Sequence, residues 1–321
     1  MKSSIIFLGF LVAGAMYTHA SEFQPETISN DGSVISNSMN RQTDDMAPYP
    51  GNNQDAAFGF SMESGSRQLT QFDGERIATA NFAGYNQRFQ LENIIGTDTR
   101  SKIDPYDSKT RYSYPARATV LVTFTRSGSD FICSGAMIGP DTVLTAGHCL
   151  HGGGATEDWS TDVSVIPAYS QSTGTKTPYG VCDAKTLRTF SKWVAEADRA
   201  YDLGAIKLEC KIGNRTGWYG IKKGGINKLP TIITGYPGDK PKTDQWQAVD
   251  WVRKSDRYNF QHKADTYGGM SGSPVWVDNG VGPYIIGVHT AGNSTINLAT
   301  SVTQAFFKAV VSWKNQPWED Q

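Results

Sequence analysis

Short runs of β-branched, aliphatic and aromatic residues dominate the chain from Ala116 to about residue 300. Turn-forming stretches separate these runs, for example Gly139-Pro140-Asp141 and Asp278-Asn279-Gly280. Many short strands between turns predict antiparallel sandwiches or barrels, and not strands that alternate with helices. The predicted strands cover residues 117–125, 136–146, 162–169, 203–209, 229–236, 272–277 and 284–290.

The predicted strands form two groups, at about 110–210 and about 225–300. The segment after them has a different period, because its apolar residues recur near one face of a helix. These residues are Val302, Phe306, Val310 and Trp313. The pattern predicts a short C-terminal helix over about 301–314, packed on the core. The expected fold class is therefore all-β, with a short C-terminal helix.

The N-terminus has the parts of a secretory signal peptide. Lys2 supplies a positive charge, an apolar run covers residues 5–16, and small residues end the segment at Ala20. A membrane anchor is the alternative, but a run of about 12 residues is too short to cross a bilayer. Residues 1–20 are predicted to be a signal peptide, and the protein is expected to be secreted and extracellular, with no membrane partner.

An exported protein with four cysteines is expected to form two disulfides. The cysteines are Cys133, Cys149, Cys182 and Cys210, and the sequence alone allows three pairings. A zinc site is the alternative, but none of the four falls in a C-x-x-C pair. We therefore expect no metal site and no cofactor.

Charge divides the remaining chain near residue 92. Residues 21–92 carry ten acidic side chains against four arginines, a net charge of −6, and few aliphatic side chains. Residues 93–321 carry 25 basic and 21 acidic side chains, a net charge of +4. The acidic stretch is either a disordered linker or a propeptide that docks by charge. The basic side chains form no stripe, so no nucleic-acid partner is expected.

Three short segments contain residue types that cooperate in nucleophilic catalysis. They are VLTAGHCL with His148, AYDLGAIKL with Asp202 and GGMSGSP with Ser271. A serine hydroxyl is a weak nucleophile that needs a base, and histidine titrates near neutral pH. A carboxylate then holds the imidazole in the right tautomer. Each segment alone is a weak signal, but together they predict a catalytic triad.

Glycines precede and follow the predicted nucleophile. A bare backbone at that place lets N–H groups point at the negative oxygen that develops during acyl transfer. The amides of Gly269 and Ser271 are the expected donors of this oxyanion hole. Loss of one such donor typically raises the barrier by about 3 kcal/mol.

These segments resemble those of chymotrypsin-fold serine proteases. From residue 94 to about 315 the chain resembles the secreted glutamyl endopeptidases of bacteria, with similar segments in IIGTDTR, GYPGDK, DTYGGMSGSP and VHTAG. The resemblance implies a chymotrypsin-like double antiparallel β-barrel, six strands in each barrel, with the triad in the cleft between them. It also implies a disulfide between Cys133 and Cys149, which leaves Cys182 to pair with Cys210.

The resemblance leaves two interpretations of the substrate pocket. Asp265 lies six positions before Ser271, where trypsin carries the aspartate that selects Arg or Lys. Glutamyl endopeptidases can also carry an aspartate there, turned away from the pocket, and they bind an acidic side chain with a Thr and a His. Thr266 and His289 match that pair, and a hydroxyl and an imidazole can both donate hydrogen bonds to a carboxylate.

Activation is expected to differ from that of trypsin. Trypsin-like enzymes place an aspartate before the nucleophile to receive the new N-terminal amine, and Met270 cannot form that ion pair. In glutamyl endopeptidases the mature amine lies near the pocket, and the resemblance puts the mature start at Asn93, directly after Glu92. Residues 21–92 are therefore predicted to be a propeptide, and residues 93–321 the protease domain.

The prediction is a secreted serine endopeptidase that cleaves after Glu, and more weakly after Asp, through an acyl-enzyme. Trypsin-like specificity through Asp265 is one alternative, and a protease-like binding protein without catalysis is another. The expected partners are protein or peptide substrates and the chain's own propeptide, and the enzyme is expected to be a monomer. His151 and His262 lack metal-ligand spacing and are expected at the surface. The predicted substrate-binding residues are Asn93, Thr266, His289, Thr290 and Gly292.

Overall fold

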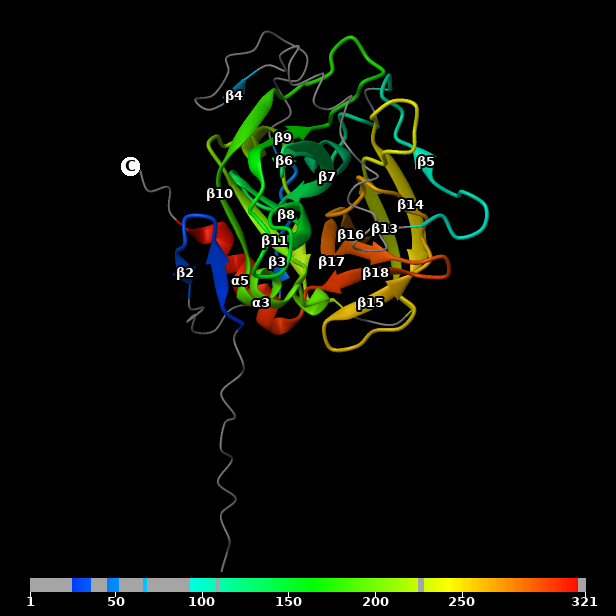
Figure 1. Cartoon of the computed structure of the whole chain (residues 1–321). Coiled ribbons are helices and arrows are strands. Elements are labelled where there is room, and N and C mark those ends of the chain that lie inside the picture. Colours follow the sequence, from blue (N-terminus) through cyan, green and yellow to red (C-terminus); the bar gives the residue numbers. More distant parts are fainter. Residues whose placement is uncertain are drawn as a thin grey trace, which may run out of the picture.

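A computed structural model describes most of the chain after residue 92 and three short stretches before it (Figure 1). The predicted signal peptide lies outside the described residues. The described strands form two sheets, in which all the strand pairs but one are antiparallel. The sheets lie side by side, the first in green and the second in yellow to orange. The described residues are 25–35, 45–51, 66–67, 93–107, 110–224 and 228–316.

The first sheet closes into a six-stranded barrel, because β11 pairs with both β8 and β10. The ring runs β6-β7-β8-β11-β10-β9 and returns to β6. Successive side chains of β6 point in opposite directions, so Val120 and Val122 enter the main core while Leu121 packs with Tyr236 of the second barrel. The strands are β6 (Thr119–Arg126), β7 (Ser129–Met137), β8 (Thr142–Thr145), β9 (Thr161–Pro167), β10 (Val181–Phe190) and β11 (Gly204–Leu208).

The second sheet runs β14-β13-β16-β17-β18-β15. The chain that leaves β14 turns back beside β15, with backbone hydrogen bonds between Gln261 and both Arg253 and Lys254. This turn links β14 and β15, the first and last strands of that order. The strands are β13 (Pro230–Gly235), β14 (Trp246–Trp251), β15 (Asn259–His262), β16 (Pro274–Asp278), β17 (Pro283–Gly292) and β18 (Asn297–Ser301).

The C-terminal helix α5 (Gln304–Asn315) begins later than predicted, because Thr303 caps it by accepting a hydrogen bond from the Phe306 N–H. Phe306, Val310 and Trp313 are buried, as the sequence pattern predicted. The predicted all-β double barrel with a C-terminal helix is confirmed. None of the described helices is long and apolar enough to cross a membrane. The remaining helical elements are η2 (Ala116–Ala118), η3 (Gly147–Cys149), α3 (Ser191–Glu196), η4 (Arg199–Tyr201) and α4 (Gly213–Thr216).

The described parts of residues 21–92 contact the barrels through strand pairing. The hairpin of β1 (Thr27–Ser29) and β2 (Val34–Ile35) adds to β10, and β2 lies on the outer side of the first barrel (Figure 1). Two further short strands of this region pair with the barrels, β4 with β10 and β3 with β12. Beyond this region, β5 pairs with β14. Their bounds are β3 (Asp45–Met46), β4 (Ser66–Arg67), β5 (Ser101–Lys102) and β12 (Gly220–Lys222).

Candidate active site

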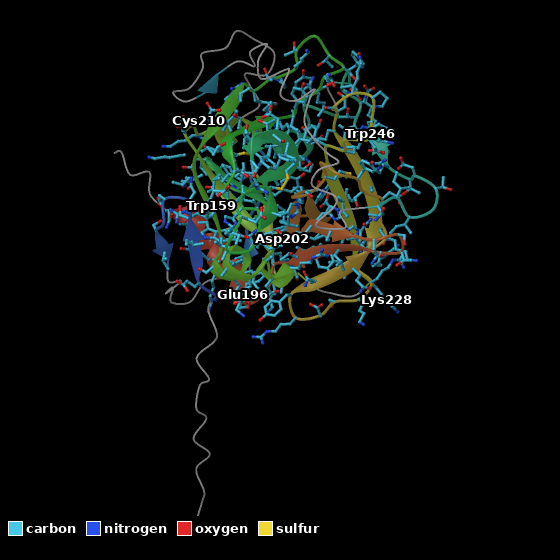
Figure 2. The ribbon with its side chains drawn as sticks, in the orientation of Figure 1. Trp159, Glu196, Asp202, Cys210, Lys228 and Trp246 are labelled. Atoms are coloured by element: carbon cyan, nitrogen blue, oxygen red, sulfur yellow. A yellow bond between two sulfur atoms is a disulfide. The ribbon has the colours of Figure 1, made fainter. Side chains whose placement is uncertain are left out.

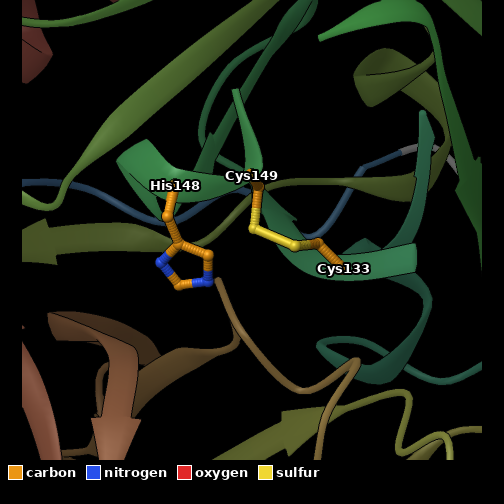
Figure 3. A group of neighbouring side chains, drawn as sticks. All are labelled: Cys133, His148 and Cys149. Atoms are coloured by element: carbon orange, nitrogen blue, oxygen red, sulfur yellow. A yellow bond between two sulfur atoms is a disulfide. The ribbon is translucent and has the colours of Figure 1, made fainter. Parts of the chain in front are cut away.

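His148 lies in the short helix η3, directly after β8, where a disulfide fixes the backbone. Cys149 is bonded to Cys133 of β7, as the resemblance implied (Figure 3). The His148 side chain is almost fully buried between the two barrels. The disulfide therefore ties the residue after His148 to the neighbouring strand. The second predicted disulfide, Cys182–Cys210, is also present.

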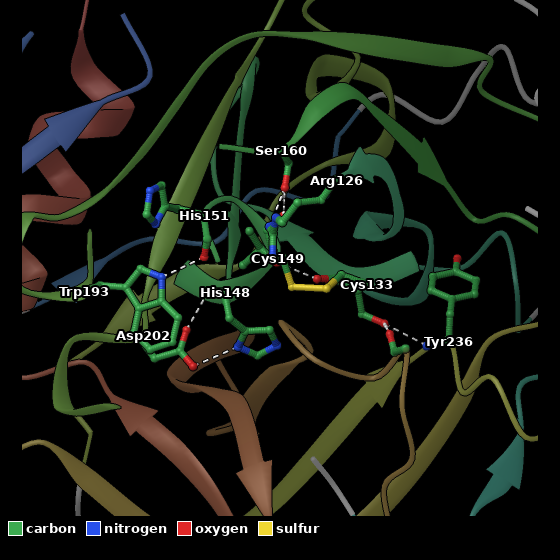
Figure 4. Close-up of a disulfide and its surroundings, with 12 residues drawn as sticks. Arg126, Cys133, His148, Cys149, His151, Ser160, Trp193, Asp202 and Tyr236 are labelled. Atoms are coloured by element: carbon green, nitrogen blue, oxygen red, sulfur yellow. Dashed lines mark hydrogen bonds and ion pairs between the residues drawn. A yellow bond between two sulfur atoms is a disulfide. The ribbon is translucent and has the colours of Figure 1, made fainter. Parts of the chain in front are cut away.

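Asp202 follows η4 and holds His148 at two points. Its Oδ1 accepts a hydrogen bond from the His148 backbone N–H at 2.8 Å, and its Oδ2 lies 2.8 Å from His148 Nδ1 (Figure 4). Asp202 lies near the centre of the molecule (Figure 2). A Cβ on Gly147 would lie 3.2 Å from Asp202 Oδ1, so the glycine before the histidine makes room for the carboxylate. With Nδ1–H donated to Asp202, Nε2 is the basic nitrogen of His148.

Ser271 lies in the loop before β16, and residues of the first barrel hold this loop. The Ser134 N–H donates to the Ser271 carbonyl at 2.7 Å, and Ser134 Oγ donates to the Gly269 carbonyl at 2.8 Å. Gly272 has a φ of +83°, and a Cβ there would overlap the Ser134 carbonyl and Thr145 Oγ1. The glycine after Ser271 thus lets the loop approach the strand that leads to His148.

The backbone of Gly269, a predicted oxyanion-hole donor, is fixed by the loop that contains Gly238. The Gly268 carbonyl accepts from the Gly238 N–H at 2.7 Å. In a trans peptide the next N–H points the opposite way, so the Gly269 N–H faces away from Gly238. The φ of Gly269 is +99°, which disfavours any residue with a side chain.

Asp265 is buried, and its carboxylate binds Ile95 and Thr99. Its Oδ1 accepts from the Ile95 N–H at 2.7 Å. Its Oδ2 accepts from both the N–H and the hydroxyl of Thr99, each at 2.7 Å. The carboxylate that could mimic the trypsin pocket is thus hydrogen-bonded to segment 93–100 of its own chain.

The same segment brings Asn93 beside Thr266. The Asn93 carbonyl accepts from the Thr266 N–H at 3.3 Å and from Asn297 Nδ2 at 2.9 Å. The Asn93 N–H donates to Asn297 Oδ1 at 3.1 Å. Thr266 Oγ1 is buried and has no hydrogen-bond partner within the described part of the chain. Asn297 therefore holds the predicted mature N-terminus at the predicted pocket.

His289 lies on β17, next to the loop that carries Ser271. Its N–H donates to the Ser273 carbonyl at 2.9 Å, and its carbonyl accepts from the Gly272 N–H at 2.8 Å. Thr290 and Gly292 follow on the same strand, where Gly292 pairs with Asn297 of β18. These contacts bring the predicted specificity residues and the nucleophile loop into one region of the second barrel.

The expectation that His262 and His151 are surface residues is wrong. His262 is fully buried on β15, and its Nε2 lies 3.2 Å from His289 Nδ1. Burial, together with the nearby His289, holds the pKa of His262 well below its usual range. His151 is buried beside Trp159, and burial lowers its pKa to about 4. His151 also accepts, through its carbonyl, a hydrogen bond from Trp193 Nε1 (Figure 4).

Three residues that build this site are absent from the predicted site residues: Ser134, Thr145 and Asn297. Ser134 holds the nucleophile loop, and Thr145 Oγ1 donates to the Ser134 carbonyl at 2.7 Å. Asn297 binds both Asn93 and the Ala264 carbonyl. A signal existed for Ser134 and Thr145, since they lie one and three residues from the predicted Cys133 and His148. Nothing in the local sequence marks Asn297.

Comparisons with known proteins show the family to which the chain belongs. A family model described as Trypsin matches residues 107–313. The chain is 36% identical over 239 residues to a glutamyl endopeptidase of Bacillus licheniformis, which covers 71% of each protein. It is 30% identical over 304 residues to an extracellular metalloprotease of Bacillus subtilis, covering 92% of this chain and 90% of that one. A solved structure of a Glu endopeptidase matches with a TM-score of 0.60 at 30% identity, over 70% of this chain and 100% of that one.

The name of the Bacillus subtilis relative raises the question of a metal site. Among the described residues, one group of three potential ligands lies close together: Cys133, His148 and Cys149. Both sulfurs of that group are bonded to each other, and a metal binds the thiolate form of cysteine. The group therefore does not fit a metal ion. The family match and the identity to a glutamyl endopeptidase show that the chain is a serine endopeptidase of the trypsin family and belongs with its glutamyl endopeptidases.

Proposed function

We propose that this chain is made as a secreted precursor and acts as a monomeric endopeptidase that cleaves proteins and peptides after Glu, and more weakly after Asp. The observation that carries this specificity is the set of donors around Asp265. Both of its carboxylate oxygens accept hydrogen bonds from Ile95 and Thr99. A substrate guanidinium would have to displace these bonds, so trypsin-like specificity through Asp265 is disfavoured.

The residues around Asp265 suit an acidic side chain. The buried hydroxyl of Thr266 lacks a partner among the described residues, and buried polar groups are normally satisfied. If neutral His262 donates from Nε2 to His289 Nδ1, the proton of His289 lies on Nε2 and can be donated to a carboxylate. Thr290 and Gly292 would line the same strand. Two donors and a nearby amine would bind Glu well, and the positive charge of the amine would repel Arg or Lys.

The reaction is acyl transfer. Ser271 Oγ attacks the scissile carbonyl carbon while His148 Nε2 takes the hydroxyl proton, and His148 then gives that proton to the leaving amine. Asp202 keeps His148 in the tautomer with Nδ1–H and stabilises the imidazolium. The N–H groups of Gly269 and Ser271 stabilise the oxyanion. Water, activated by the same histidine, hydrolyses the acyl-enzyme and restores Ser271.

Activation would follow from the same specificity. The Asn93 nitrogen lies 3.1 Å from Asn297 Oδ1, and the Asn93 carbonyl accepts a hydrogen bond from the Thr266 N–H. Hydrolysis of the Glu92–Asn93 bond converts that amide nitrogen into an amine at the same place. The new positive charge beside Thr266 then favours a substrate carboxylate. Removal of residues 1–20 on secretion and of residues 21–92 by this cut would leave 93–321 as the mature domain.

Paired peptides that differ only in Glu or Arg before the scissile bond test the proposal. We expect kcat/KM for the Glu peptide to exceed that for the Arg peptide by about a thousandfold or more. The pocket donors and the amine attract the negative Glu side chain, whereas the amine opposes the positive Arg side chain. N-terminal sequencing of the secreted protein is expected to begin at Asn93. Faster cleavage after Arg would overturn the specificity, and a different N-terminus would overturn only the processing.

A further inference from the structure

Residues 45–51, which precede the protease domain, occupy a shaped site on its surface. Met46 of β3 pairs with Ile221 of β12. Farther along, Tyr49 and Trp218 exchange two backbone hydrogen bonds of 2.9 and 2.8 Å. The two rings lie 4.3 Å apart between centroids. The segment thus adds an extended strand to an edge of the domain, which is a common mode of peptide recognition.

Glycines of the domain lie where the segment passes. A Cβ on Gly220 would lie 2.7 Å from the Met46 carbonyl oxygen, and a Cβ on Gly282 would lie 2.7 Å from Pro48 Cγ. A Cβ on Gly217 would overlap the carbonyl groups of Tyr49 and Pro50. Any side chain at these three positions would collide with the segment. We refer to Gly217, Gly220 and Gly282 as the glycine cradle.

A buried arginine of the domain needs the segment as an acceptor. The Arg117 guanidinium donates to the Tyr112 carbonyl at 2.8 Å, to the Thr216 carbonyl at 3.1 Å and to the Pro50 carbonyl. Only 5% of Arg117 is exposed. Removing one acceptor from a buried cation leaves a donor unsatisfied, which opposes release of the segment.

The glycine cradle lies away from the substrate pocket. β12 pairs with β17 at Tyr284 and Ile285, near the beginning of that strand. His289 lies four residues farther along, roughly 13 Å at the rise of a strand. A segment bound in the cradle can therefore stay in place while the pocket binds substrate.

We propose that residues 45–51 stay bound in the glycine cradle after the bond between Glu92 and Asn93 is cut. The propeptide then remains attached to the processed enzyme as a noncovalent subunit. The cut itself rests on the proposed function, whereas the cradle does not. The β1–β2 hairpin supplies a second attachment, in which the Asn30 N–H donates to the Leu187 carbonyl and Asn30 Oδ1 accepts from the Leu187 N–H.

The test uses the full chain with Ser271→Ala and with the recognition sequence of an unrelated, sequence-specific protease inserted before Asn93. After that protease has cut the chain, size-exclusion chromatography and mass spectrometry report whether the propeptide elutes with the domain. We expect one peak that contains both pieces. Separate elution would overturn the inference. Because the cut is supplied from outside, failure of self-processing in the active chain would contradict the proposed function and leave this result intact.

Two glycines of the propeptide form a matched pair of variants. Gly51 has a φ of +73°, and its Cβ would overlap the Gly217 nitrogen. Gly32 has a φ of +81° and nothing within 4 Å of its Cβ. We expect Gly51→Ala to raise the Kd of the cut complex, measured by dilution, about tenfold or more, and Gly32→Ala to change it far less. Equal effects would show that the cradle does not hold the segment.

A third variant keeps the test decisive if Gly51→Ala prevents folding. Tyr49→Ala removes the ring that lies on Trp218 but leaves both backbone hydrogen bonds in place. We expect Tyr49→Ala to raise the Kd about two- to tenfold, the range measured for aromatic pairs. An unchanged Kd for Tyr49→Ala would overturn the placement of this segment.

Discussion

Two buried aspartates organise two different regions of the molecule. Asp202, in the first barrel, accepts hydrogen bonds from the backbone and the ring of His148. Asp265, in the second barrel, accepts them from the backbone of Ile95 and from the backbone and hydroxyl of Thr99. Both carboxylates are almost inaccessible to solvent. Asp202 thus orients a group that can transfer a proton, whereas Asp265 orients a length of chain.

The difference lies in the donors and not in the carboxylates. An imidazole that donates to Asp202 can accept a proton on its other nitrogen, so the pair can act in catalysis. Backbone N–H groups do not titrate, so Asp265 can only fix the position of segment 93–100 and thereby of Asn93. The role of a buried aspartate is therefore decided by what faces it, and substitutions in the two regions should fail in different ways.

Replacing the nucleophile should have the largest effect. Ser271→Ala is expected to lower kcat by about a millionfold, because no other group can form the acyl-enzyme. Labelling by a fluorophosphonate should be lost with it. Ser273→Ala is the matched control, since Ser273 is also buried and its hydroxyl has no partner among the described residues. Residual labelling of Ser271→Ala, or equal losses in both variants, would contradict the assignment.

Asp202→Asn should have the next largest effect. The amide has nearly the shape of the carboxylate but favours the wrong tautomer of His148, so kcat is expected to fall about ten-thousandfold. Asp244→Asn is a suitable control, since Asp244 is equally buried but binds Ser170 and Ser172. That variant should lose stability and keep kcat. A small change in kcat for Asp202→Asn would remove the distinction between the two aspartates.

Much of the fold could be predicted because apolar strands alternate with turn residues. The predictions for β6, β9, β13 and β17 fall within a few residues of the observed strands. Strands that contain many polar residues were missed. β10 carries Asp183, Lys185 and Arg188, and β18 consists largely of small polar residues. These segments become strands because neighbouring strands pair with them, and a local pattern does not record such pairing.

The residues of the candidate site also divide into those that a local sequence pattern predicts and those that only long-range contacts reveal. His148, Asp202 and Ser271 could be predicted as a catalytic triad because each lies in a short motif. The surroundings of Asp265 could not, because its donors are about 170 residues away in sequence and belong to an irregular segment. His262 has no motif at all, and only the pairing of β15 with β18 brings it to His289. Long-range contacts thus decide which residues support the site.

Substitution of Asp265 tests the second region. Asp265→Asn should weaken two or three hydrogen bonds to a charged acceptor, lowering the free energy of unfolding by about 2–4 kcal/mol and kcat/KM for a Glu peptide about ten- to a hundredfold. Thr99→Val removes only the hydroxyl donor and should give a smaller change in the same direction. Cleavage after Arg should not appear in either variant. If Asp265→Asn instead abolished an existing cleavage after Arg, Asp265 would be a pocket residue.

Acid should destabilise both barrels, because each contains a buried histidine. This is the smallest of the expected effects. The pKa of His151 is about 4 and that of His262 is well below its usual 6.5, in both cases mainly through burial, so the unfolded chain binds more protons as the pH falls below about 6.5. The free energy of unfolding should therefore decrease with falling pH. Between about pH 7.5 and about pH 5, His151 should account for up to about 2 kcal/mol of that loss, and His262 should contribute in the same direction.

Urea unfolding of His151→Gln and His262→Gln, each in the Ser271→Ala background to prevent self-digestion, measures these contributions separately. Each substitution should reduce the difference between the two pH values, and the double variant should reduce it by about the sum, since the two histidines lie in different barrels. An unchanged pH dependence in His262→Gln would mean that His262 has the same pKa in the folded and the unfolded protein. His262 would then become a cation beside His289 as the pH falls through that pKa, and a neutral His262 could no longer set the tautomer of His289 there.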